Sequence, residues 1–325
     1  LGITLDVVAN AQRLLLRVEG PDEHLEQALA LVDDLLEHPQ LDERRFAVLR
    51  KEVWGEARVT RQDPAMLAEA LREYVFHGQD SAFLRAYGPR EIKRLGPERA
   101  LEAVARAQGY ATAFRYVGPR GLAELEPLVR ANFTPKASLA PAVPYVIRER
   151  QLPSEPTVFF LPERGAVQTQ IYFAVEGEPV ARDQRALADA YGEFMGGDMA
   201  GLVFQEIREF RALAYSAWGR YRRDGDTIQA SYFVGFVGCQ ADKTEESIAA
   251  MLGLIQDFPA RADNLASVQT SLIHALETEA PDFRSVQQRL ESWQRAGYAG
   301  DPRPELLAGY QALRFEDVQA LFEDQ

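Results

Sequence analysis

Arg208 and Tyr215 are the two side chains of this sequence best suited to hold a peptide, and they stand seven residues apart. A guanidinium carries a permanent charge and a fork of N–H donors that fits a peptide carbonyl or a carboxylate. A tyrosine hydroxyl can donate a hydrogen bond to an oxyanion as it develops. An amphipathic helix pattern carries Arg208 and a strand pattern beginning at residue 214 carries Tyr215, so a helix–turn–strand unit would bring both to one sheet edge, where a substrate strand could add.

Each of these residues also has a purely structural interpretation. Arg208 has Glu206 and Glu209 within reach for a surface ion pair, and Tyr215 follows two apolar residues and could pack in the core. Gly196 and Gly197 precede the helix, and we interpret them as a hinge in which the backbone turns tightly beside a substrate; a flexible loop is the alternative. The substrate-binding candidates are therefore Arg208, Tyr215, Gly196 and Gly197.

Zinc-binding motifs are absent from the sequence. None of the four histidines has a glutamate or a second histidine at the spacing of His-x-x-Glu-His or His-Glu-x-x-His; they are His24, His38, His77 and His274. Glu52 and Glu56 are four residues apart on a predicted helix, but the interleaved Arg50 and Lys51 favour a solvated helix face. The sequence likewise has no nucleophile elbow, phosphate-binding loop, dinucleotide fingerprint or calcium loop. We expect no catalytic residues in this chain alone.

Gly196-Gly197, Phe204-Gln205-Glu206-Ile207-Arg208 and Leu213-Ala214-Tyr215 together resemble a motif of the pitrilysin/insulinase family of zinc metallopeptidases, the inverzincins. The resemblance is greatest to the C-terminal, non-zinc half of long bacterial members, in which two tandem units form a hinged chamber. It implies that Arg208 and Tyr215 orient a peptide substrate over zinc held by a complementary unit, on the same polypeptide or a partner chain. Glu56 lies roughly where the family has a distant zinc ligand, but Leu49 replaces the expected partner acid, which leaves Glu56 a weak metal candidate.

Two other functions remain open. The chain is alternatively a catalytically inactive scaffold of the same fold, like the core subunits of respiratory complexes, in which Arg208 has no role. A third interpretation is half of a homodimeric peptidase whose zinc helix lies upstream of Leu1. The resemblance covers nearly the whole chain, although the sequence starts at a strand and ends soon after residue 318, so we expect a unit truncated at both ends.

The composition restricts partners and compartment. The net charge is −13, with 36 basic against 49 acidic residues, which disfavours nucleic acid and anionic membranes. No apolar run approaches the roughly 20 residues of a membrane helix, so no membrane insertion is expected. Cys239 is the single cysteine, which excludes internal disulfides. Because the sequence starts at Leu1 without a charged and then apolar leader, we expect a signal peptide to be either absent or already removed. Arginine far outnumbers lysine, as in a GC-rich genome; a soluble protein of the bacterial cytoplasm is favoured slightly.

The periodicity predicts an α+β fold of two tandem related domains, each a mostly antiparallel sheet covered by helices. In the first half, strands are expected over residues 14–18 and 110–117, and helices over 22–37, 42–60, 64–75, 91–107 and 122–132. In the second half, strands are expected over 169–175, 214–222 and 228–236, the last two joined by a hairpin at 224–226. Helices are expected over 182–195, through Arg208, over 244–255 and from 264 onward. The proline-rich residues 134–156 predict a linker between domains at 1–133 and 157–325.

Overall fold

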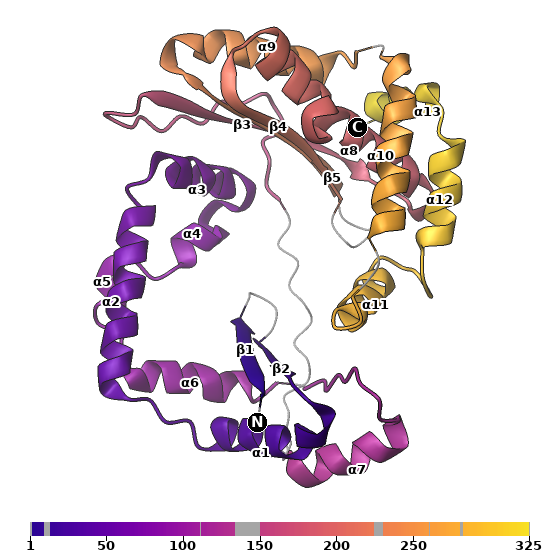
Figure 1. Cartoon of the computed structure of the whole chain (residues 1–325). Coiled ribbons are helices and arrows are strands. Elements are labelled where there is room, and N and C mark those ends of the chain that lie inside the picture. Colours follow the sequence, from indigo (N-terminus) through magenta and orange to yellow (C-terminus); the bar gives the residue numbers. More distant parts are fainter. Residues whose placement is uncertain are drawn as a thin grey trace. The chain divides into compact units, whose positions relative to one another are not determined.

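The computed structural model describes residues 2–9, 14–110, 112–133, 150–223, 230–259, 261–279 and 282–324. These residues form helices and small antiparallel sheets, which confirms the predicted α+β class (Figure 1). None of the described helices combines the length and the apolar character that crossing a bilayer requires. The predicted linker lies largely, and the turn at 224–226 wholly, outside the described residues.

The chain forms two compact units whose boundaries interleave along the sequence. The first unit comprises residues 1–61 and 85–148, and the second comprises residues 62–84 and 149–325. Residues 62–84, which come from the first half of the sequence, therefore pack within the second unit. The division into domains at 1–133 and 157–325 stays a prediction.

The first unit holds a two-stranded antiparallel sheet and five helices among its described residues. Strands β1 (Thr4–Ala9) and β2 (Leu14–Glu19) pair in register from Thr4 opposite Glu19 to Ala9 opposite Leu14. The helices are α1 (Leu25–Glu37), α2 (Glu43–Thr60), α5 (Pro89–Ile92), α6 (Pro97–Ala107) and α7 (Leu122–Asn132). The periodicity predicted β2, α1, α2 and α7 correctly, whereas β1 was not predicted.

The predicted strand at 110–117 is wrong. Among its described residues only Tyr110 forms an isolated bridge, and residues 112–117 form no strand. Side-chain bonds hold this segment instead: the Tyr116 hydroxyl donates to Asp22 at 2.5 Å, and Arg120 Nε lies 2.7 Å from the other Asp22 oxygen. The Tyr116 hydroxyl, together with Arg120, holds the pKa of Asp22 below its usual value. The alternating apolar and polar residues at 112–117 therefore belong to a segment that polar side-chain contacts hold in place, and not to a strand.

A three-stranded antiparallel sheet forms the centre of the second unit. It comprises β3 (Gln168–Pro179), β4 (Ala214–Arg222) and β5 (Ala230–Gln240) in the order β3-β5-β4. The central strand β5 pairs with β3 from Gln168 opposite Gln240 to Pro179 opposite Ala230. All three strands were predicted. Within the described part of the chain, β4 is an edge strand, so the main-chain groups on its outer side face no other strand.

Helices pack against one face of this sheet and leave most of the other to a single segment. Face B, which consists of the core-facing residues of the three strands, carries Phe233, Val237 and Cys239. These residues form one cluster with Met195 of α8 (Arg185–Gly196) and Met251 of α9 (Thr244–Gln256). The helices of this layer are α8 (Arg185–Gly196), α9 (Thr244–Gln256), α10 (Leu265–Thr278), α11 (Val286–Arg295), α12 (Arg303–Ala312) and α13 (Phe315–Asp324).

The opposite face of the sheet, face A, carries aromatic and charged side chains. Helix α3 (Pro64–His77) packs there. A short turn at 78–80 and α4 (Ala82–Arg85) follow it along the chain. Phe76 of α3 meets Tyr232 of β5 edge to face with ring centroids 5.6 Å apart. On β4, Trp218 stacks on Phe236 of β5 at 5.4 Å. Trp218 and Tyr232 are thus partly buried against neighbouring aromatic rings rather than fully enclosed in the core.

Candidate substrate-binding site

Arg208 lies on a short helix with an unusually wide turn. Residues Phe204–Phe210 form a π-helix, η5, anchored by Ile207, whose side chain is completely buried. Helical segments of this type occur mostly as single-turn irregularities and often at functional sites. The predicted helix is confirmed, and its polar face presents Arg208 with 44% of the side chain exposed.

Tyr215 occupies a β-bulge at the start of β4. Ala214 pairs with Cys239 and Ser216 pairs with Gly238, so Tyr215 is one extra residue with no partner on β5. A bulge re-aims a side chain, and Tyr215 as a whole residue is 84% exposed. The alternative in which Tyr215 packs in the core is therefore wrong, because the bulge turns it outward while Ala214 stays buried.

The structure brings Arg208 and Tyr215 together. The guanidinium carbon of Arg208 lies 5.9 Å from the centroid of the Tyr215 ring and 4.7 Å from that of Phe204. Both distances are within the range of a cation–π contact. Phe204 was not predicted as part of the site, although its position four residues before Arg208 on a helix is a signal for such contact. The three side chains form an exposed patch that combines one cation with two aromatic rings.

The neighbouring glutamates leave Arg208 largely free for another partner. Glu206 is bound by Arg261, whose Nη2 lies 3.1 Å from its Oε1, and lies 3.9 Å from Arg211. Glu209 is the nearest acid to Arg208, at 3.7 Å, and both side chains are about half exposed. An exposed ion pair at this distance contributes little, at most about 1 kcal/mol. A ligand carboxylate or carbonyl can therefore compete for the guanidinium.

Gly196 and Gly197 have a clear packing function. Gly196 is the last residue of α8, and a Cβ on it would lie 1.8 Å from the carbonyl oxygen of Gly219 in β4. A Cβ on Gly197 would lie 2.5 Å from the carbonyl oxygen of Glu193. Gly197 is buried and has an ordinary negative φ of −65°. Both glycines thus permit close approach of backbone; their role in substrate binding stays a prediction.

The described residues do not provide a zinc site. Nowhere among them do three or more histidine, cysteine, aspartate or glutamate side chains gather in a group able to hold a metal ion. Glu56 lies on the exposed face of α2 in the first unit. The histidine, cysteine and carboxylate side chains of the described residues therefore do not fit a catalytic zinc ion, which needs three protein ligands.

A strained residue joins η5 to β4. Ala212 has a φ of 50°, in the left-handed region, and the N–H of Leu213 donates to the carbonyl of Ile207 at 3.0 Å, one residue further back than in a Schellman helix end, in keeping with the wide turn of the π-helix. This conformation costs an L-residue about 1–2 kcal/mol. Glycine avoids that steric cost, although a glycine gives the unfolded chain more conformational entropy to lose on folding. We expect Ala212→Gly to raise the free energy of unfolding by about 0.5–1 kcal/mol in urea denaturation. The same change at exposed Ala249 inside α9 should lower it by about 1 kcal/mol; equal signs would contradict the strain.

Comparison with known proteins agrees with these features. Residues 116–272 match the family model described as the peptidase M16 inactive domain. A search by sequence among curated proteins found no match. Among solved structures, a peptidase M16 inactive domain from Pseudomonas fluorescens shares 16% identity at a TM-score of 0.69, over 98% of this chain and 77% of that one.

Two further structures have the same fold in different settings. The periplasmic protease PqqL from Escherichia coli matches at a TM-score of 0.69 and 16% identity, over 99% of this chain but 36% of its own length. Complex III2 from Candida albicans contains a chain that matches at a TM-score of 0.63 and 14% identity, over 99% of this chain and 79% of that one.

The family model over residues 116–272 and the fold shared with these structures support the resemblance to the pitrilysin-like family, and within it to the C-terminal half, the inactive domain.

Proposed function

We propose that the protein is the substrate-binding, non-zinc half of a zinc metallopeptidase that cleaves peptides in a closed chamber. The observation that carries this proposal is the exposed contact between Arg208 and Tyr215 at the start of an edge strand. The match to the inactive domain supports it. Zinc then belongs to a complementary unit of the same family, on the same polypeptide or on a partner chain.

The two side chains divide the work of orienting a peptide. The Arg208 guanidinium donates to a peptide carbonyl or carboxylate and fixes the chain direction. The Tyr215 hydroxyl donates to the carbonyl oxygen as negative charge develops on it. The rings of Phe204 and Tyr215 hold the guanidinium plane, so the donors are oriented before the substrate arrives.

The test is zinc-dependent cleavage of a pool of quenched fluorescent peptides by the chain together with the flanking polypeptide that its gene encodes. We expect Arg208→Ala to lower kcat/KM at least tenfold, about 1.4 kcal/mol of transition-state stabilisation. Tyr215→Phe, which keeps the ring and removes the hydroxyl, should lower kcat more than it changes KM.

Arg211→Ala is the matched control, because Arg211 follows the same helix, is 52% exposed and lies near Glu206 instead of Tyr215. Its activity should stay within about twofold of wild type. An equal loss for Arg208→Ala and Arg211→Ala would contradict the proposed orienting role.

A catalytically inactive scaffold is the second candidate function. The structural match to a chain of Complex III2 supports it, since the same fold occurs there as part of a larger assembly. No cleavage in any combination with the flanking polypeptide, and no effect of Arg208→Ala on assembly, would favour the scaffold.

A further inference from the structure

Beyond its bulge, β4 alternates regularly between the two faces of the sheet. Tyr221 lies on face B, where its ring meets that of Tyr191 of α8 with centroids 4.8 Å apart. Arg220 and Arg222 flank Tyr221 along the strand and therefore project from face A, because successive residues of a strand point to opposite faces. Two arginines of the edge strand thus lie on the face of the sheet away from α8.

A row of aromatic rings lies beside these arginines on face A. Tyr172 of β3, Phe236 of β5 and Trp218 of β4 are directly opposite one another in the strand register. The ring centroid of Phe236 lies 5.0 Å from that of Tyr172 and 5.4 Å from that of Trp218. The guanidinium carbon of Arg220 lies 4.9 Å from the Trp218 centroid, within the range of a cation–π contact. The Arg220 guanidinium is thus held in place, so it loses less conformational freedom when it binds an anion.

Helix α3 covers the β3 side of face A and leaves the β4 side accessible. The guanidinium carbon of Arg72 on α3 lies 5.7 Å from the centroid of the Tyr172 ring. On β4, Arg220 and Arg222 are exposed and Trp218 is half-buried. A peptide can therefore reach both arginines from solvent.

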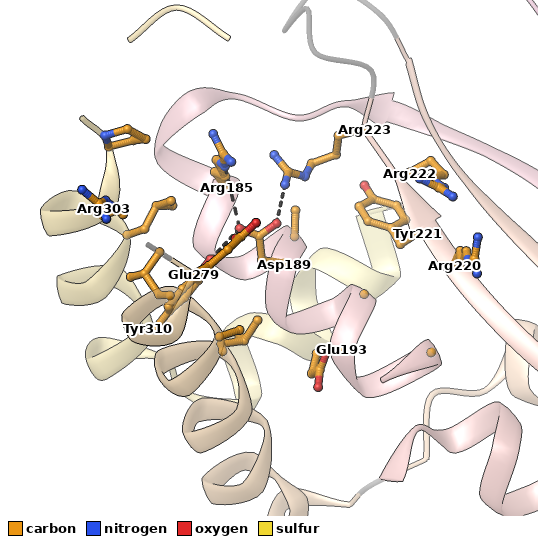
Figure 2. Close-up of a pocket in the computed structure, with 18 of the residues that line it drawn as sticks. Arg185, Asp189, Glu193, Arg220, Tyr221, Arg222, Arg223, Glu279, Arg303 and Tyr310 are labelled. Carbon is orange, nitrogen blue, oxygen red and sulfur yellow. Dashed lines mark hydrogen bonds and ion pairs between the residues drawn. The ribbon is translucent and has the colours of Figure 1, made fainter. Parts of the chain in front are cut away.

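The arginines on the two sides of β4 differ in their acidic partners. A groove with a volume of about 670 Å³ lies on the α8 side of the strand, and Figure 2 shows Arg185 and Arg223 both reaching Asp189 in it. Arg220 and Arg222 have no such partner: neither forms an ion pair with a carboxylate in the part of the chain that the structure describes.

The acids of face A and of α3 already have partners within the fold. Glu176 on β3 lies 3.5 Å from Arg150 Nε. On α3, Arg72 contacts Glu69 and lies 3.6 Å from Glu73. The β4 side of face A is therefore a positively charged surface on a protein whose net charge is −13.

The position of this surface relates it to the end of β4 that carries Tyr215. Arg220 and Arg222 lie five and seven residues beyond Tyr215, which corresponds to about 16 and 23 Å along a strand. An extended peptide spans these distances in the same number of residues, and its alternate side chains have the same two-residue spacing as the two arginines. Carboxylates are the side chains that form charge-assisted hydrogen bonds with guanidinium groups.

We propose that the β4 side of face A is a specificity subsite, at which Arg220 and Arg222 bind acidic side chains of the peptide substrate about five to seven residues from the cleaved bond. The place of this subsite in catalysis rests on the proposed function, in which the Tyr215 hydroxyl lies at the bond that is cleaved. The peptide contacts the arginines through its side chains and needs no main-chain pairing with residues 219–223.

The test is fluorescence anisotropy on the chain together with the flanking polypeptide that its gene encodes, with EDTA present so that no peptide is cleaved. The probes are labelled peptides that carry Glu-Thr-Glu near one end, and matched peptides that carry Gln-Thr-Gln instead. We expect the glutamate peptide to bind at least about fivefold more tightly than the glutamine peptide at low ionic strength. The ratio of the two Kd values should fall toward one as salt is added, because salt screens exposed charges.

Arg220→Gln with Arg222→Gln should lower that ratio below about twofold and leave the Kd of the glutamine peptide nearly unchanged, which also shows that the variant is folded. Arg220→Lys with Arg222→Lys keeps both charges and should keep most of the ratio. The matched control is Arg295→Gln with Arg314→Gln, which removes the same charge from exposed positions on α11 and just before α13. The control should leave the ratio unchanged.

A wild-type ratio below about twofold, a ratio that persists in Arg220→Gln with Arg222→Gln, or an equal fall in the control pair would overturn the subsite. Because these measurements need neither zinc nor cleavage, failure of the proposed function is seen separately, as an intact ratio without cleavage when zinc is restored. Where peptides are cleaved, mass spectrometry should find acids enriched about five to seven residues from the cleaved bond. Cleavage without such enrichment would contradict the proposed subsite.

Discussion

Gly196→Ala is expected to lower the free energy of unfolding of the second unit by about 3 kcal/mol. The added methyl carbon would lie 1.8 Å from the carbonyl oxygen of Gly219 and 2.6 Å from its carbonyl carbon. Both neighbours are main-chain atoms of β4, so no flexible side chain can move aside. Helix α8 must instead shift from the sheet, which disrupts the contacts of Met195 and Phe194 in the core.

Gly253→Ala supplies a matched control, because Gly253 lies in α9 of the same unit with open space at its Cβ position. The same substitution there should raise stability by about 0.5–1 kcal/mol. Urea unfolding can be followed by tryptophan fluorescence in a Trp54→Phe background, in which Trp218 and Trp293 report the second unit alone. Equal stability of the two alanine variants would show that α8 and β4 are not in close contact.

Asp189→Ala should be the second most damaging change, with a loss of about 2–3 kcal/mol in the same urea assay. The Asp189 carboxylate accepts from Arg223 and from the Tyr310 hydroxyl at 2.8 Å, and Arg185 lies 3.8 Å away. Its side chain is 19% exposed, so solvent compensates poorly for the lost partners. Removal of the carboxylate leaves two guanidinium groups facing each other without a counter-charge.

Glu305→Ala tests whether the loss of unfolding free energy is specific to the polar network around Asp189. Glu305 pairs with Arg182 at 2.6 Å, but both side chains are about half exposed. An exposed pair of this kind contributes about 0–1 kcal/mol. If Asp189→Ala proves no more destabilising than Glu305→Ala, then the polar network around Asp189 does not support the fold.

The sequence predicted those elements whose pattern is local. Helices α1, α2, α7 and α8 and the strands of the second unit follow from apolar periodicity alone. The Arg208 and Tyr215 pair was found through a family motif, and periodicity by itself gave no reason to prefer it. The strand expected at 110–117 failed because alternation does not provide a neighbouring strand to pair with.

Sequence patterns could not predict the groove whose lining includes Asp189 and Arg223. Its lining comes from β4 and four helices between Arg185 and Tyr310, and no motif links them. The packing role of Gly196 was missed for the same reason, since it depends on Gly219, which lies on a different element. Likewise, no local signal separates the π-helix at 204–210 from an ordinary helix.

The bulge at Tyr215 shows how a binding residue can be gained without rebuilding the core. Ala214 and Ala217 are both buried, and the two residues between them are exposed, so the inward and outward alternation of β4 changes phase at this point. One additional residue therefore places an exposed aromatic ring on the strand while every later residue keeps its register with β5. In evolutionary terms, a single-codon insertion is sufficient to add Tyr215, and related strands without it should align to this one with a one-residue gap.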